Sequence, residues 1–193
     1  MPSFKELLQK TPLDLAEVAR HLDGLSHDQR VEEVYAIPGK LQRKLFSAAA
    51  AGSLGVDYFV PESTPSRKFV RHYGKNSLPV FSRFEKRFAR PQDGADTAWG
   101  FNFSPVMAIV GPGHFILRDG SDRHPEMHVD YYDIPSERID GAPPLKENTA
   151  GIQTLVYGNM VDVLRRVSDH VTIGRAIKKG KETHNYFLLC REA

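Results

Sequence analysis

The spacing of apolar residues changes near Asp57, and this change limits the folds that the chain can adopt. Before Asp57, apolar residues recur every three or four positions, which is typical of amphipathic helices. After it, short runs of aromatic and β-branched residues alternate with polar residues and are interrupted by Gly and Pro, as in strands joined by turns. We therefore predict an α+β protein with a helical N-terminal segment, residues 1–56, packed on an antiparallel β-barrel domain, residues 57–193.

The composition is that of an ordinary soluble domain. The chain has 193 residues, enough to bury a core without disulfides or metals. Its formal net charge of +2 is too small to indicate nucleic-acid binding by itself. The only cysteine, Cys190, excludes a disulfide within the chain and fits a reducing cytoplasm. We expect a cytoplasmic protein with no signal peptide and no membrane span, in which Cys190 is a small buried hydrophobe.

Helix start signals repeat along the N-terminal segment. Ser3 to Glu6 and Ser26 to Gln29 each read as a capping box, in which both side chains satisfy free backbone N–H groups. Thr11-Pro12 predicts a second helix start, because proline is tolerated at the first helical position. Pro38 predicts a fourth helix that runs to Gly52. We expect these helices to cap one barrel end or to form a dimer interface.

The remainder of the chain predicts about ten short strands joined by turns rich in Gly, Asn and Pro. The candidate strands are residues 68–73, 81–90, 98–103, 106–110, 114–118, 127–132, 154–157, 161–167, 170–178 and 185–191. This number of short strands favours a closed antiparallel barrel, with a sandwich as the alternative. The Pro-rich segment 135–151 is a candidate lid or rim.

The C-terminal residues contain a recognisable succession of short motifs. Tyr157-Gly158-Asn159 leads into a strand, Ile173-Gly174-Arg175-Ala176 follows a turn, and Tyr186-Phe187-Leu188-Leu189 comes last. This succession resembles the closing strands of calycin-type barrels, the lipocalin and fatty-acid-binding class. The resemblance implies a pocket for a small, largely apolar ligand.

Our first functional hypothesis is that the barrel cavity binds a small hydrophobic or amphipathic molecule, anionic ones included. Aromatic side chains are expected to form its walls: Phe81, Phe84, Trp99, Phe101, Phe103, Tyr132 and Tyr157. Three arginines are candidates for holding a polar or anionic end: Arg83, Arg165 and Arg175. A buried arginine needs a carboxylate, from either the protein or the ligand.

The alternative hypothesis is a metal-free isomerase, cyclase or hydrolase that uses the same cavity. His128 and Asp130 point to one face of a strand, and a carboxylate beside an imidazole is the arrangement of a general base. His114, at the start of another strand, could join them. Two histidines and a carboxylate also suit a metal ion, with His124 as the second histidine. No second cluster completes a metal motif and no nucleotide fingerprint is present, so we expect neither metal nor cofactor.

Charge is segregated along the chain. Basic residues and aromatics interleave between Arg67 and Arg90, whereas acidic residues predominate between Asp119 and Glu147. The basic stretch could hold an anionic head group, bind single-stranded nucleic acid, or simply be a solvated face with aromatics in the core. We favour the solvated face and do not expect nucleic acid as a partner. The opposed patches could pair within the fold or between the subunits of a homodimer.

Overall fold

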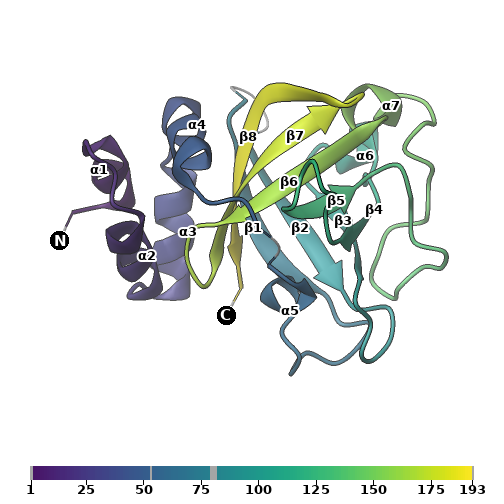
Figure 1. Cartoon of the computed structure of the whole chain (residues 1–193). Coiled ribbons are helices and arrows are strands. Elements are labelled where there is room, and N and C mark those ends of the chain that lie inside the picture. Colours follow the sequence, from purple (N-terminus) through teal and green to yellow (C-terminus); the bar gives the residue numbers. More distant parts are fainter. Residues whose placement is uncertain (1, 53, 79–81, 193) are drawn as a thin grey trace.

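The computed structural model describes residues 2–52, 54–78 and 82–192, and these residues form an α+β fold built around a closed antiparallel barrel. In this part of the chain each strand pairs with the next one in sequence, and the last strand pairs with the first (Figure 1). The predicted fold class is confirmed. Of the two arrangements left open by the sequence, the strands form the barrel and not the sandwich. The described strands are β1 (Val70–Asn76), β2 (Arg83–Ala89), β3 (Ala98–Phe103), β4 (Phe115–Arg118), β5 (Met127–Asp130), β6 (Met160–Arg166), β7 (Val171–Lys178) and β8 (Lys181–Arg191).

The first four described helices lie together on one side of the barrel (Figure 1). They are α1 (Phe4–Gln9), α2 (Leu15–Asp23), α3 (His27–Tyr35) and α4 (Gly39–Ala48). The capping boxes at Ser3 and Ser26 are both formed. The predicted start at Thr11-Pro12 is wrong, because α2 begins at Leu15, where the Asp14 carboxylate accepts hydrogen bonds from the first-turn backbone.

The helices bury the outer face of the last three strands. Val34 and Leu45 belong to one core cluster with Ile173, Leu188 and Cys190. Since side chains alternate across a strand, β7 and the second half of β8 are covered by helices outside and by the barrel core inside, which explains why nearly all of their residues are buried. Cys190 is buried in this cluster, as predicted, and burial raises the pKa of its thiol to about 11.

Two of the candidate strands are wrong, because the chain forms short helices there. Residues 106–110 contain α6 (Met107–Val110), and residues 154–157 overlap α7 (Gln153–Val156). In α6 the N–H of Val110 donates to the carbonyl of Val106, a local bond that replaces pairing with a neighbouring strand. Apolar runs this short do not distinguish helix from strand by periodicity. Both helices lie at the same end of the barrel (Figure 1).

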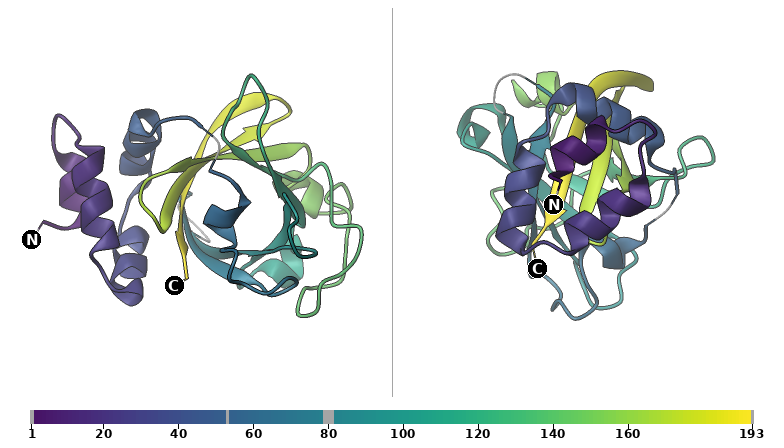
Figure 2. Two further views of the ribbon diagram at one scale, coloured as in Figure 1. Left: turned by 60° about the horizontal axis from the view of Figure 1, so that its bottom comes forward. Right: turned by 90° about the vertical axis from the view of Figure 1, so that its left-hand side faces the viewer.

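The opposite end of the barrel is closed by a short helix, α5 (Val56–Phe59), which contains the residue at which the apolar period changes. Seen along the barrel, α5 sits within the ring of strands (Figure 2). The buried Phe59 ring packs against Phe88 and against the imidazole of His72, whose Nε2–H donates to the Phe59 carbonyl. The interior is therefore filled at the α5 end, and any cavity must open towards α6 and α7.

Candidate functional site

A cavity of about 310 Å³ occupies the barrel end that carries α6 and α7. A volume of this size suits a small organic molecule. Most of its walls are apolar, and four of its polar side chains are buried, whereas Asn76, Ser104 and Asn185 are more exposed. The cavity is lined by Asn76, Leu78, Phe84, Lys86, Asn102, Ser104, Val106, Val110, Tyr131, Val156, Tyr157, Met160, Asp162, Ala176, Asn185 and Phe187.

The inner end of the cavity is organised around Lys86, whose side chain is only 2% exposed. Its Nζ lies 2.9 Å from Oδ1 of Asn102 and 3.0 Å from Oδ2 of Asp162. It also donates to the hydroxyl of Tyr131. An ammonium has three protons, so these three acceptors satisfy it. We call Lys86, Asn102, Tyr131 and Asp162 the polar floor.

Three strands supply one polar-floor residue each, and the fourth residue comes directly after another strand. Lys86 is on β2, Asn102 on β3 and Asp162 on β6, while Tyr131 directly follows β5. The Asn102 amide nitrogen donates to the Gly113 carbonyl at 3.0 Å and lies 3.1 Å from the Tyr131 hydroxyl, which fixes its orientation. The floor is thus held by rigid strands rather than by loops, which suits a preorganised site.

Aromatic rings surround the Lys86 ammonium. Its Nζ lies 5.0 Å from the ring centre of Tyr131, 5.1 Å from that of Phe115 and 5.3 Å from that of Phe187. The electron-rich faces of such rings attract a cation. Burial lowers the pKa of Lys86 below its usual value, while the Asp162 carboxylate counteracts part of that shift. Burial also raises the pKa of the Tyr131 hydroxyl.

The cavity is formally uncharged. Among its described lining residues, Lys86 is the one cation and Asp162 the one anion, and the two neutralise each other. A buried ion pair is weak evidence for stability, because its desolvation cost offsets the Coulomb attraction.

Two of the predicted ligand-binding residues line the cavity, namely Phe84 and Tyr157. Phe81 lies outside the described residues. Arg83, at the start of β2, stacks on the Tyr35 ring of α3 at 4.5 Å, outside the barrel. Phe103 lies under the Arg87 guanidinium, and Tyr132 is 54% exposed.

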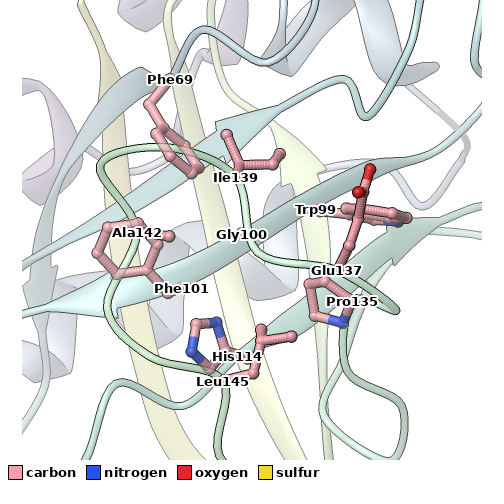
Figure 3. Close-up of a pocket in the computed structure, with 10 residues that line it drawn as sticks. All are labelled: Phe69, Trp99, Gly100, Phe101, His114, Pro135, Glu137, Ile139, Ala142 and Leu145. Carbon is pink, nitrogen blue, oxygen red and sulfur yellow. The ribbon is translucent and has the colours of Figure 1, made fainter.

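Trp99, Phe101 and His114 come together, but on the outer face of the barrel. They line a small pocket between β3 and the segment 135–145, which crosses over the strand (Figure 3). Its volume of about 10 Å³ holds at most one water molecule. The His114 Nε2–H donates to the Pro144 carbonyl at 3.2 Å, and burial lowers the pKa of this imidazole. Much of the predicted lid segment thus packs against the barrel wall.

His128 and Asp130 share a face of β5, as expected, but it is the outer face. Met127 and Val129 take the inward positions and belong to the barrel core. The His128 Nε2–H donates to the His124 carbonyl at 3.0 Å, and Oδ2 of Asp130 lies 3.5 Å from Arg118. Neither residue lines the cavity, and neither does His114. A catalytic role for these three residues stays a prediction.

Arg165 and Arg175 also point outwards, which corrects the expectation that they face the cavity. Arg165 donates to Oε1 of Glu126 at 2.8 Å and to the carbonyls of Phe46 and Ala49 at the end of α4. Arg175 pairs with Glu182. Both guanidinium groups stack on the Phe46 ring, so these arginines fasten α4 to the barrel. The reason is strand alternation, since Asp162 and Leu164 take the inward positions of β6 and Ala176, next to Arg175 in β7, lines the cavity.

The sequence-based candidates did not include the polar floor. One local signal could have indicated Lys86: in β2 it alternates with Phe84 and Phe88, so a strand places the lysine on the aromatic face. Nothing local indicates Asn102, Tyr131 or Asp162, because they meet Lys86 only when the barrel closes.

Within the described residues, no group of three or more His, Cys, Asp or Glu side chains is arranged to hold a metal ion. Nor does any helix in that part of the chain have the length and apolarity to cross a membrane. No protein-family model, curated protein or solved structure matches this chain.

Proposed function

We propose that this protein binds a small amphipathic molecule in the barrel cavity. The observation that carries the proposal is the cavity itself, about 310 Å³ in volume, with apolar walls and a buried polar floor. An apolar pocket with a few convergent polar groups is the usual form of a small-molecule site. The similarity of the C-terminal strands to calycin-type barrels supports the same function.

The arrangement of the walls indicates how such a ligand would lie. Val110 and Val156, from α6 and α7, line the cavity at the helix-bearing end of the barrel. Phe84, Tyr157 and Phe187 line it as aromatic walls. The apolar part of the ligand would contact these side chains, and its polar end would reach Lys86 and Asp162.

The test is a fluorescence titration with N-phenyl-1-naphthylamine, an uncharged apolar probe, followed by displacement with 1-nonanol. Ala176 lines the cavity, so Ala176→Phe fills part of the space and should weaken probe binding at least tenfold. Trp99→Leu is the matched control, because Trp99 belongs to the outer pocket. Its affinity should stay within twofold of the wild type.

If Trp99→Leu weakened probe binding and Ala176→Phe did not, the binding site would lie on the outer face of β3. Absence of saturable probe binding, in a protein shown to be folded by circular dichroism, would overturn the proposal. Native mass spectrometry of the protein purified from its own source complements the titration, because a co-purifying organic molecule names the ligand's chemistry directly.

A further inference from the structure

We propose that the cavity takes an amphipathic aldehyde or ketone and that Lys86 forms an imine with its carbonyl carbon. This inference rests on the proposed function and names its ligand class. It follows from the placement of an amine, a carboxylate and a phenol at the inner end of one apolar cavity.

The charge of the polar floor argues against a carboxylate ligand. Asp162 already neutralises the Lys86 ammonium at 3.0 Å, and no other cation stands among the described lining residues. An entering carboxylate would lose its hydration and meet an anion beside the only cation. An uncharged oxygen avoids that penalty, so the floor favours an alcohol or a carbonyl compound.

Of these two uncharged classes, only the carbonyl compound reacts with a lysine amine, with which it forms a Schiff base. The overall reaction is ammonium plus aldehyde giving protonated imine plus water, so one positive charge is present before and after. In both the reactant and the product that charge is on Nζ, beside the Asp162 carboxylate and within the rings of Phe115, Tyr131 and Phe187. The environment that holds the ammonium therefore also holds the product.

The neighbouring groups can move the protons that the reaction requires. Asp162 accepts one proton from the Lys86 ammonium, leaving an amine whose lone pair attacks the carbonyl carbon. A C–N bond forms, and the carbonyl π electrons move to oxygen, which takes a proton from the Tyr131 hydroxyl. The Tyr131 oxygen recovers a proton from the nitrogen of the adduct.

The oxygen then leaves as water, taking the proton held by Asp162, while the nitrogen lone pair forms the C=N bond. Burial, which lowers the pKa of Lys86, favours the neutral amine that this sequence needs. Asp162 and Tyr131 end in the protonation states in which they began.

The test traps the imine chemically. The wild-type protein is incubated with a limiting amount of nonanal and sodium cyanoborohydride, which reduces an imine to a stable secondary amine. Intact mass should show one nonyl group per chain, and peptide mapping should place it on Lys86. An excess of 1-nonanol should protect Lys86 and leave surface lysines unaffected, which tests the site without any variant.

Two variants sharpen the result. Lys86→Arg keeps a cation for Asp162 but supplies no amine. The rate at which the protein acquires a nonyl group should therefore fall at least tenfold. Lys40→Arg is the matched control, because Lys40 is exposed on α4. It should label as the wild type does.

The outcomes separate the two proposals. If 1-nonanol displaces the fluorescent probe but nonanal labels Lys86 no faster than exposed lysines, the imine is overturned and the binding function stands. If the probe shows no saturable binding to the folded protein and Lys86 is not labelled, both proposals fail.

Discussion

Lys86 on β2 and Asp162 on β6 meet across the barrel interior, with 3.0 Å between Nζ and Oδ2. Their side chains are 2% and 4% exposed, so the pair is almost fully removed from water. The two residues are on strands that do not pair with each other, and the ion pair therefore links opposite sides of the barrel at the wall of the cavity.

The first prediction concerns the stability of this pair. Asp162→Asn leaves the Lys86 charge buried without its counter-ion and should lower the free energy of unfolding by about 3–5 kcal/mol. The double variant Lys86→Met/Asp162→Leu removes both charges and should recover most of that loss. Urea unfolding of the single and double variants measures both values. A double variant no more stable than Asp162→Asn would contradict the prediction.

The second prediction concerns a close approach inside the barrel. A Cβ added to Gly100 would lie 2.3 Å from the Arg87 carbonyl oxygen and 2.4 Å from the Phe115 ring. A backbone oxygen cannot move aside easily, so Gly100→Ala should destabilise the protein by about 1–3 kcal/mol. Thermal or urea unfolding checks this value. Gly52→Ala, which meets nothing within 4 Å, is the control and should unfold like the wild type.

The third prediction concerns pH. Burial between Phe59 and Phe88 lowers the pKa of His72 to about 3, with the charge of Arg191 adding to the shift. Between pH 6.5 and pH 3, His72 binds a proton in the unfolded chain, where its pKa is near 6.5, but stays neutral in the native state. The contribution of His72 is therefore constant above pH 6.5, and stability falls as the pH drops from there towards 3.

Urea unfolding at pH 7.5 and pH 4.5 measures this loss, which we expect to be about 2–3 kcal/mol from His72. His72→Asn lacks the titrating group and should lose correspondingly less between the two pH values. His184→Gln, at an exposed position of β8, is the control and should follow the wild type. If the wild type and His72→Asn lost the same free energy of unfolding between the two pH values, His72 would not be the source of the pH dependence.

The fourth prediction concerns the histidines that the sequence singles out. Because His128 faces away from the cavity and bonds to the His124 carbonyl, His128→Ala should leave probe affinity within twofold of the wild type. Tyr157→Ala removes a cavity wall and should weaken binding about tenfold. A tenfold loss in His128→Ala would show that the outer face of β5 takes part in ligand binding.

Much of the fold can be predicted from the sequence, because it depends on local patterns. The capping boxes at Ser3 and Ser26 need only residues three positions apart. The β8 segment that includes Cys190 was recognisable as a buried strand from its apolar run. Residues 106–110 and 154–157 were misassigned as strands, because a mostly apolar run of four or five residues fits one helical turn equally well.

The candidate site was harder to predict because a strand's direction in space is not a local property. Arg165 and Lys86 are both basic residues in apolar surroundings, yet one fastens α4 outside the barrel and the other lies at the cavity floor. Moving a strand by one residue exchanges its two faces, and only pairing with the neighbouring strands sets that register.

By itself, therefore, the sequence determined the α+β class, the helical N-terminal segment, the strand-rich remainder and the burial of Cys190. Each of these follows from periodicity or from contacts between near neighbours in the chain. Only the tertiary structure decided that the barrel closes and that Lys86, Asn102, Tyr131 and Asp162 meet. These four residues are far apart in sequence, and ring closure brings their strands to face one common interior.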